Sequence, residues 1–388
     1  SESEWSATFI RTNCNHRVRL EMCEPSHLGR LRMIVDADTG ADDALSLLIG
    51  CVHADVALIC CCDGNVESTI AADNTLRLLS AIGFADQIPV AVGPSASSSE
   101  GRHWGRHFDD AFITKPTQLL CSHLASKEMV TVALKEQPNT VTLVCTGPLS
   151  NIGEAIRYAK ETSCLDRFLN SFCKVVIMGG LCNPDAYPGS LPSNAEFNIR
   201  ASVLDSRAVW EASWPTHIEF VLVPIDPVVR SPLKYADAAR VRNLGTNKSV
   251  AAWSVLNLHV GKDKIMVQSH GYEIYDAFAM AVTINPLGHR FVDADVTLYP
   301  TGQLIVDCIG EPSSNLYKHQ QQEQDHDQKQ NQTPTQKKNH PENQELEQEP
   351  EQEQHQTQLL EKKFKSQTPS KYWPFKQNTE WCVSRKML

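Results

Sequence analysis

Four aspartates fall within eight consecutive positions of the segment MIVDADTGADDALSLLIG, residues 33–50, between two apolar runs: Asp36, Asp38, Asp42 and Asp43. Carboxylates this close repel one another, and they are costly to desolvate unless a cation or a set of hydrogen-bond donors lies among them. Two interpretations are open at this point. The acids are solvated at the start of a helix, where negative charge favours the dipole, or they bind a metal ion.

Two known aspartate patterns do not fit this segment. An EF-hand loop needs a ligand at its fifth position and glycine at its sixth, where this chain has Gly40 and Ala41. A phosphatase of the haloacid dehalogenase type needs D-x-D-x-T, but Thr39 falls one place early and Gly40 occupies the threonine position. Neither chemistry is therefore expected.

From about residue 31 to 310, short apolar runs alternate with helical patterns, which is typical of a parallel sheet with crossover helices. The predicted strands are residues 32–38, 56–62, 89–93, 141–147, 174–180 and 218–226, and predicted helices include 42–52, 68–83 and 150–161. Each strand runs into a turn that carries Asp, Gly, Asn or Thr. We predict one large α/β domain with an open, mostly parallel, doubly wound sheet flanked by helices, whose strand ends converge on one crevice.

The two ends of the chain have a different character. Residues 1–30 are poorly periodic and are treated as an N-terminal arm, and residues 311–358 are rich in Gln and Glu. Residues 318–358 contain a single apolar side chain, Leu346, so this segment is predicted to be disordered. Residues 359–388 regain aromatic and β-branched side chains. They either return to the domain as a closing strand or form a tail.

Composition excludes several classes of function. The net charge of −10 argues against a nucleic-acid surface, which needs clustered Lys and Arg, and no apolar run is long enough to span a bilayer. Three of the thirteen cysteines are adjacent in a predicted buried strand, at positions 60–62. This placement favours buried thiols over a disulfide framework, and so favours a reducing, cytoplasmic compartment. The chain starts with Ser1, so a removed leader and secretion are left open.

The aspartate segment closely resembles the D-x-D-x-G-x-D-D signature of the nucleoside hydrolases. Four further blocks follow in the family's order: GNV at 64–66, TGPLSN at 146–151, MGG at 178–180 with NAEFN at 194–198, and YDAFAMAVTINP at 275–286. The resemblance covers about residues 31–308. It implies an enzyme that hydrolyses the N-glycosidic bond of ribonucleosides with a bound Ca²⁺.

The resemblance also implies roles for individual residues. The implied Ca²⁺ ligands are Asp38, Asp43, the backbone carbonyl of Thr146 and Asp276. Asp38 is also implied as the base that deprotonates the attacking water, and Asp36 as a residue that orients the metal ligands without binding the ion. The implied substrate contacts are Asp42, Asn65, Met178, Glu196 and Asn198. Their hydrogen bonds are expected to reject a 2′-deoxy sugar, because the analogue leaves polar groups of the site unpaired.

The chain departs from the family pattern at a few positions. Thr39 stands where proline is usual, and Ser190 where an asparagine contacts the 5′-hydroxyl, with Asn194 nearby as a substitute. Tyr275 replaces a histidine that protonates the departing base in some members, so it is a candidate catalytic residue, and whether it acts as the acid is left open. The loop GRHWGRHFDDAF, residues 101–112, resembles the family's histidine-glycine loop, although His107 stands where Asp is commoner. Trp104 in this loop is a candidate to stack on a purine base, and the alternative is a packing or surface aromatic.

These observations predict a ribonucleoside hydrolase that acts on a small molecule, binds neither nucleic acid nor membrane, and forms a homo-oligomer, either a dimer or a tetramer. Which base is preferred is left open. The alternative is a catalytically weakened homologue that binds ribose and metal, or that acts through its Gln/Glu-rich segment. Retention of the metal aspartates favours the enzyme, whereas Tyr275 and Ser190 favour the alternative.

Overall fold

The computed structural model describes residues 8–12, 30–94, 108, 112, 120–182, 195–260 and 270–308, all within one compact unit. The strands are β1 Thr8–Thr12, β2 Arg32–Ala37, β3 Asp55–Cys61, β4 Val90–Val92, β5 Val141–Cys145, β6 Phe172–Met178, β7 Glu219–Val223, β8 Arg290–Leu298 and β9 Leu304–Cys308. The helices are α1 Ala41–His53, α2 Ser68–Ile82, α3 Ala125–Ala133, α4 Ser150–Glu161, α5 Leu165–Asn170, α6 Phe197–Ala201, α7 Val203–Trp210, α8 Ile225–Arg230, α9 Tyr235–Arg242, α10 Asn247–Val260 and α12 Tyr275–Ile284. The predicted segments 311–358 and 359–388 lie outside the described residues, so these boundaries stay predictions.

The strands form one sheet in the order β4-β3-β2-β5-β6-β7-β1-β8-β9. The pairings from β4 through β7 are all parallel, and these six strands are the six that the sequence predicts. The chain runs outward from β2 to β4, then returns to the other side of β2 and runs outward again from β5 to β7. The predicted open, mostly parallel, doubly wound sheet is confirmed.

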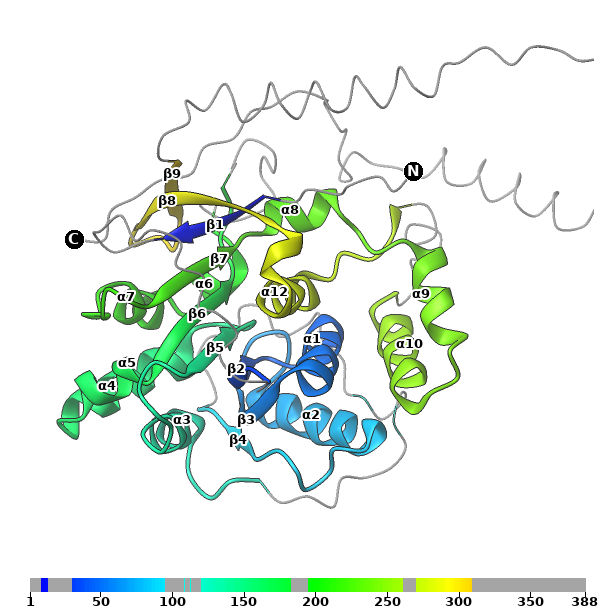
Figure 1. The fold of residues 1–388 in the computed structure, drawn as a ribbon, viewed down its shortest axis with the longest axis horizontal. Helices are drawn as coiled ribbons and strands as arrows, with labels where there is room; N and C mark the ends of the chain where they lie inside the picture. Colours follow the sequence, from blue (N-terminus) through cyan, green and yellow to red (C-terminus); the bar gives the residue numbers. More distant parts are fainter. Residues whose placement is uncertain are drawn as a thin grey trace, which may run out of the picture. The chain divides into compact units, whose positions relative to one another are not determined.

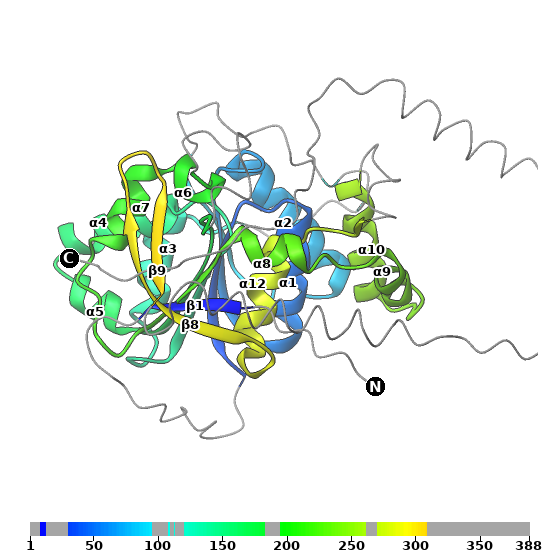
Figure 2. The same ribbon diagram turned by 90° about the horizontal axis from the view of Figure 1, so that it is seen from above.

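Side chains of each strand alternate between two apolar cores, one on each face of the sheet. In β2, Met33 and Val35 join the core formed with α1, α2, α10 and α12, whereas Ile34 joins the core formed with α3, α4, α5 and α7. Figures 1 and 2 show these two groups of helices on opposite sides of the sheet. Because both faces are covered, the strands are almost continuously apolar, which is why the sequence reveals them.

The far side of the sheet holds three strands that the sequence analysis does not identify. Residues 8–12 belong to the stretch treated as an N-terminal arm, but they form β1, antiparallel to β7 and parallel to β8. The segment TFIRT has the β-branched and aromatic composition of a strand, but five residues are too few to show a period. Strands β8 and β9 then close this side as an antiparallel pair.

Cysteines 60–62 are buried free thiols, as predicted. Cys60 belongs to one core and Cys61 to the other, in keeping with their adjacent positions on β3. Within the described residues, no helix has both the length and the apolar character needed to cross a bilayer.

Candidate active site

The site lies where the winding of the sheet reverses. Strands β2 and β5 are neighbours, but the helices that follow them pack on opposite faces, which is the point at which open α/β sheets bind ligands outside the carboxyl ends of the strands. Asp38 directly follows β2, and Thr146 directly follows β5. Thr146 N donates to the carbonyl oxygen of Asp36 at 2.8 Å, which joins the two strand ends. The topology therefore positions the first two predicted site residues.

Helix α1 begins immediately after this turn and carries two of the aspartates in its first turn. Gly40 caps the helix, and its backbone N–H donates to Asp43 Oδ2 at 2.9 Å. Thr146 Oγ1 donates to Asp43 Oδ1 at 2.9 Å, so both oxygens of this buried carboxylate are held. Asp42 is half-buried beside it.

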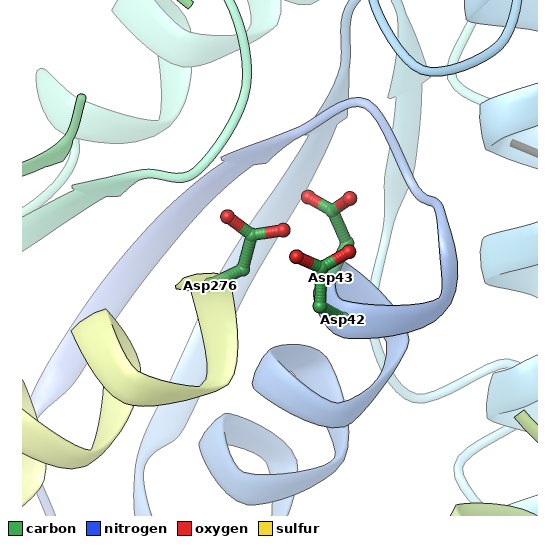
Figure 3. Close-up of side chains that lie close together, drawn as sticks. All are labelled: Asp42, Asp43 and Asp276. Carbon is green, nitrogen blue, oxygen red and sulfur yellow. The ribbon is translucent and has the colours of Figure 1, made fainter. Parts of the chain in front are cut away.

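The third helical aspartate arrives from far along the chain. Asp276 lies in the first turn of α12, which packs along α1 so closely that a Cβ on Gly50 would lie 3.1 Å from Met280 Cε. The ligand oxygens of Asp42, Asp43 and Asp276 lie within 4.8 Å of one another, and Figure 3 shows the three side chains at the starts of the two helices. Both helix N-termini direct positive partial charge toward this cluster.

Asp38 completes the group from the turn after β2, with an exposed fraction of 1%. The backbone N–H of Asn65 donates to its Oδ2, while its buried Oδ1 has no hydrogen-bond partner among the described residues. Two glycines make room for this carboxylate: a Cβ on Gly64 would lie 2.0 Å from Oδ2, and one on Gly147 would lie 2.8 Å from Oδ1. The glycines of the GNV and TGPLSN blocks are thus explained by close approach to Asp38.

Asp36 supports the same turn from inside the sheet. It is buried, and Asn151 Nδ2 at the start of α4 donates to its Oδ1 at 2.8 Å. Burial raises the pKa of Asp36 to about 7, although the Asn151 hydrogen bond opposes the shift. This position fits the orienting role expected for Asp36.

Electrostatics make the aspartate cluster costly without a positive charge. Burial, together with the charge of Asp42, raises the pKa of Asp43 to about 6. Burial and the neighbouring acids raise the pKa values of Asp38 and Asp276 well above the ordinary range. Asp43 and Asp276 lie close enough to share a hydrogen bond, so either a proton or a cation is needed between the two carboxyl groups.

The residues present fit a hard divalent cation. Three carboxylates converge from two helix N-termini, and the buried Oδ1 of Asp38 is left without a partner among the described residues. Carboxylate and carbonyl oxygens are the donors that such ions prefer. The converging trio contains Asp42, which the sequence analysis assigns to ribose, whereas the predicted ligand set contains Asp38. The structure therefore describes an aspartate cluster able to hold a metal.

The predicted substrate contacts from β6 and α6 lie next to this cluster. Asn198 Nδ2 donates to Thr146 O at 2.7 Å and to Met178 O at 3.2 Å, which ties together the ends of β5 and β6. Glu196 caps α6, and its carboxylate accepts the backbone N–H groups of Gly180, Asn198 and Ile199. Both side chains are buried. Each thus has a defined structural role at the strand ends.

Tyr275 precedes Asp276 at the start of α12 and is half-buried. Its hydroxyl donates to Glu273 Oε2 at 2.5 Å. Asn65 is also half-buried, and its Nδ2 lies 3.5 Å from Asp43 Oδ2. Trp104, Ser190 and Asn194 lie outside the described residues, so their predicted contacts with substrate stay predictions.

Sequence reasoning assigned no role to two asparagines that hold this site together. Asn151 belongs to the TGPLSN block, but its bond to Asp36 spans two strands. Asn74, on α2, donates to the backbone carbonyl of Thr39 at 2.9 Å. The sequence does carry a signal for Asn74, because it interrupts the apolar face of an amphipathic helix.

Comparison with known proteins shows the family of this chain. The family model described as inosine-uridine preferring nucleoside hydrolase matches residues 33–343. The pyrimidine-specific ribonucleoside hydrolase RihA of Enterobacter sp. (strain 638) is 26% identical over 291 residues, which are 71% of this chain and 88% of that protein. The inosine-uridine preferring nucleoside hydrolase of Leishmania major is 25% identical over 296 residues, 71% of this chain and 87% of that protein.

The solved structure of an inosine-guanosine nucleoside hydrolase matches the fold. Its TM-score is 0.60 at 22% sequence identity, and the match covers 74% of this chain and 91% of that chain. The resemblance inferred from the five sequence blocks is therefore confirmed at the level of both family and fold. The chain belongs to the inosine-uridine preferring nucleoside hydrolase family, whose members are ribonucleoside N-glycosyl hydrolases.

Proposed function

We propose that this chain is a Ca²⁺-dependent hydrolase that splits ribonucleosides into free base and ribose. The single observation that carries the proposal is the aspartate cluster, in which Asp42, Asp43 and Asp276 converge beside Asp38, whose Oδ1 has no partner among the described residues. Buried carboxylates that repel one another need a functional reason to be retained together. Family membership supplies the reaction class.

The proposed ligands are Asp38, Asp43, Asp276 and the backbone carbonyl of Thr146, with Asp42 close enough to contribute a further oxygen. The Thr146 carbonyl already accepts a hydrogen bond from Asn198, but a carbonyl oxygen has two lone pairs. When bound, Ca²⁺ would offset the repulsion among the carboxylates and lower the pKa of a coordinated water.

Asp38 is the proposed general base. The Asn65 N–H donates to Oδ2, which leaves Oδ1 as the atom proposed to accept the proton of the attacking water. A general base must lie within hydrogen-bond reach of the proton that it removes. The glycines at 64 and 147 allow this carboxylate to sit at the strand ends without displacing the backbone.

The sugar is proposed to bind over the ends of β3, β5 and β6. As the glycosidic bond breaks, the ribose gains oxocarbenium character, which nearby anionic and amide oxygens stabilise. Asp42, Asn65 and Asn198 supply such groups. Glu196 already accepts three backbone N–H groups, so about one of its four lone-pair directions is left for a ribose hydroxyl.

Activation of the leaving base is the step for which the chain departs from its family pattern. A phenol donates a hydrogen bond but is a weaker acid than imidazolium, and the Tyr275 hydroxyl already donates to Glu273. We therefore propose that hydrogen bonding and stacking, rather than full protonation by Tyr275, activate the departing base. The proposed contacts of Trp104, Ser190 and Asn194 complete the substrate site.

The test is a reducing-sugar assay on inosine, guanosine, adenosine, uridine and cytidine, each with Ca²⁺ and with a chelator. The names of the relatives cover purine and pyrimidine nucleosides, so all five are needed. Release of ribose that the chelator abolishes, and that Asp38→Ala lacks, is the expected result. Hydrolysis that chelation leaves unchanged would refute the metal mechanism.

The alternative is a weakened homologue that binds metal and ribose without efficient turnover. The engagement of Tyr275 by Glu273 is the observation that favours it. Calorimetric titration with Ca²⁺ and with ribose, combined with the reducing-sugar assay, separates the two, because the alternative binds both ligands while releasing little sugar. For the proposed hydrolase we also propose that the chain forms a homo-oligomer and is cytoplasmic. The buried free thiols support a reducing compartment.

A further inference from the structure

Helix α2 carries an asparagine on the face that packs into the core. Asn74 is fully buried, and Ala71 and Leu78, one turn before and after it, belong to the core on that face. A buried amide is costly unless its donor and acceptor ends are both paired. The partners of this amide therefore indicate why it is there.

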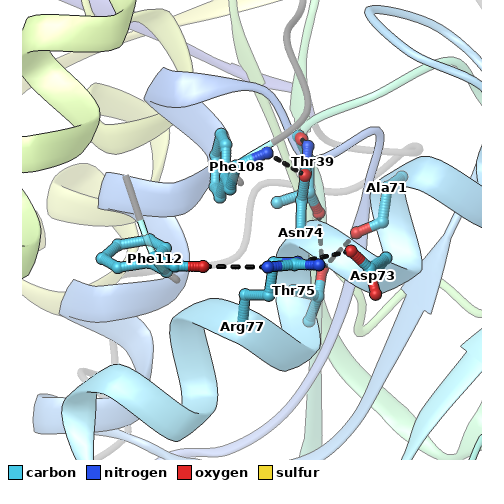
Figure 4. Close-up of polar contacts among 8 residues, drawn as sticks. All are labelled: Thr39, Ala71, Asp73, Asn74, Thr75, Arg77, Phe108 and Phe112. Atoms are coloured by element: carbon cyan, nitrogen blue, oxygen red, sulfur yellow. Dashed lines mark hydrogen bonds and ion pairs between the residues drawn. The ribbon is translucent and has the colours of Figure 1, made fainter. Parts of the chain in front are cut away.

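The two ends of the Asn74 amide contact two different segments, as Figure 4 shows. Nδ2 donates to the carbonyl oxygen of Thr39 at 2.9 Å, and Oδ1 accepts the backbone N–H of Phe108 at 2.9 Å. Thr39 directly follows Asp38, the proposed base. One buried side chain thus fixes the peptide unit next to the catalytic carboxylate.

The neighbouring residue on α2 holds the same turn by its side chain. Thr75 Oγ1 lies 2.7 Å from Thr39 Oγ1 and itself donates to Ala71 O at 2.8 Å. The Thr39 hydroxyl is therefore the donor in the bond between the two threonines. Both the backbone and the side chain of Thr39 are held by α2.

A second polar residue on α2 provides a comparison, because it holds Phe112 without contacting Thr39. Arg77 Nη1 donates to the Phe112 carbonyl at 2.9 Å, and its Nε pairs with Asp73 at 2.6 Å. Phe112 N donates to Phe108 O at 2.7 Å, and the two buried rings meet edge to face with centroids 5.8 Å apart. Asn74 and Arg77 thus anchor Phe108 and Phe112, but of these two only Asn74 also holds the aspartate turn.

We propose that Asn74 is a positioning residue for the hydrolytic site, which acts through the Thr39 carbonyl to fix the orientation of the Asp38 carboxylate and the start of α1. Its role is one of positioning rather than catalysis, because it acts through backbone atoms of Thr39 and Phe108. The inference rests on the proposed role of Asp38. If Asn74 has this role, the geometry of the aspartate cluster depends on the correct orientation of the Asn74 amide in α2.

The test uses Asn74→Asp, which is close in shape but reverses one end of the amide. When ionised, the introduced carboxylate accepts the Phe108 N–H but presents an oxygen, not a donor, to Thr39 O; because burial favours the protonated form, whose O–H would restore the donor, the variant is measured at alkaline pH. Arg77→Met is the matched control, because it removes the bond to Phe112 O and leaves Thr39 untouched. For each protein we would measure Ca²⁺ affinity by calorimetry, kcat and KM on the best nucleoside substrate, the melting temperature, and hydrogen exchange of peptides covering residues 33–50.

Asn74→Asp is expected to lose about 10- to 100-fold in Ca²⁺ affinity and in kcat, as is usual when a residue that orients metal ligands is changed. Backbone hydrogen exchange in peptides covering residues 33–50 should be faster in this variant than in the wild-type protein. Arg77→Met should lower the melting temperature while Ca²⁺ affinity and exchange at 33–50 stay at wild-type levels. If Asn74→Asp does not fold, Asn74→Ser, which also loses the two-ended amide, takes its place.

Folded Asn74→Asp with wild-type exchange at 33–50 and wild-type Ca²⁺ affinity would overturn the inference, as would equal losses in Arg77→Met. The exchange measurement does not depend on turnover. If the wild-type protein neither binds Ca²⁺ nor releases ribose, the proposed function fails, whereas the exchange comparison still decides whether Asn74 holds the aspartate turn.

Discussion

Gly147→Ala tests the idea that the position of the Asp38 carboxylate limits the reaction. An added Cβ at this site would lie 2.6 Å from Cys62 Sγ, 2.8 Å from Asp38 Oδ1 and 2.9 Å from Asp38 N. Ordinary contacts are 3.4–4 Å, so the ends of β2, β3 and β5 must separate by more than half an ångström. Overpacking of this kind costs about 1–3 kcal/mol of unfolding free energy. A misplacement of about 1 Å in a catalytic group costs on the order of 10²-fold in rate.

The expected result is therefore a folded protein with kcat lowered on the order of 10²-fold, measured by the reducing-sugar assay, and with modestly reduced stability in urea. Gly50→Ala is the control, because the nearest atom to its added Cβ is the flexible end of Met280 at 3.1 Å, and Val56 Cγ2 lies at an ordinary contact distance of 3.9 Å. Adding Cys62→Ala to Gly147→Ala relieves the contact with Sγ but leaves both contacts with Asp38. Stability should then partly recover while kcat stays low. Wild-type kcat in Gly147→Ala, or full recovery of kcat in the double variant, would refute the reasoning.

Three further predictions concern the cluster and the leaving group. Asp38→Ala and Asp276→Ala should each abolish turnover, and calorimetry should show weaker Ca²⁺ binding for both. Tyr275→Phe should cost less than about 10²-fold in kcat, since general acid catalysis contributes about 10²–10⁴-fold; a loss equal to that of Asp38→Ala, with metal content intact, would make the tyrosine an essential acid. When a chelator has removed Ca²⁺, burial raises the pKa of Asp43 from 3.8 to about 6. Between pH 3.8 and about pH 6, the folded chain therefore binds more protons than the unfolded chain. The unfolding free energy contributed by Asp43 is therefore lost as pH rises through about 6, by about 3 kcal/mol. Urea unfolding with and without Ca²⁺ should show a difference in unfolding free energy that widens from pH 4 to pH 7.

The parallel half of the sheet could be predicted because both of its faces are covered. Strands such as β2 and β5 are continuous apolar runs that end in polar turns, and that pattern is visible without any tertiary information. Strand β8, with sequence RFVDADVTL, mixes acidic and apolar residues and lies near the edge, so its pattern is weak. Strand β1 is too short to be recognised locally, and its partners lie more than two hundred residues further along the chain.

The site residues divide in the same way. Asp38, Asp43 and Asp276 follow from sequence blocks, because each stands at a fixed place in a strand–turn–helix unit. The inclusion of Asp42 in the converging trio depends on how α12 packs along α1, which no local pattern specifies. The proposed role of Asn74 depends on its hydrogen bond to the carbonyl oxygen of Thr39, and only the tertiary structure brings these two residues together.

The place of β1 in the sheet has a consequence for the order of events during synthesis. This strand leaves the ribosome before every other described element, yet it pairs with β7 and β8, which emerge much later. Once β7 is complete, β1 can pair with it, but until β8 follows, the outer edge of β1 presents unpaired backbone groups, which are a template for pairing with other chains. Long-range pairing of this kind is also slow, because the entropy cost of closing a long loop comes before the contacts that offset it. A nascent chain is therefore most prone to aggregate between completion of β7 and completion of β8, and this is the interval in which a chaperone would protect it most.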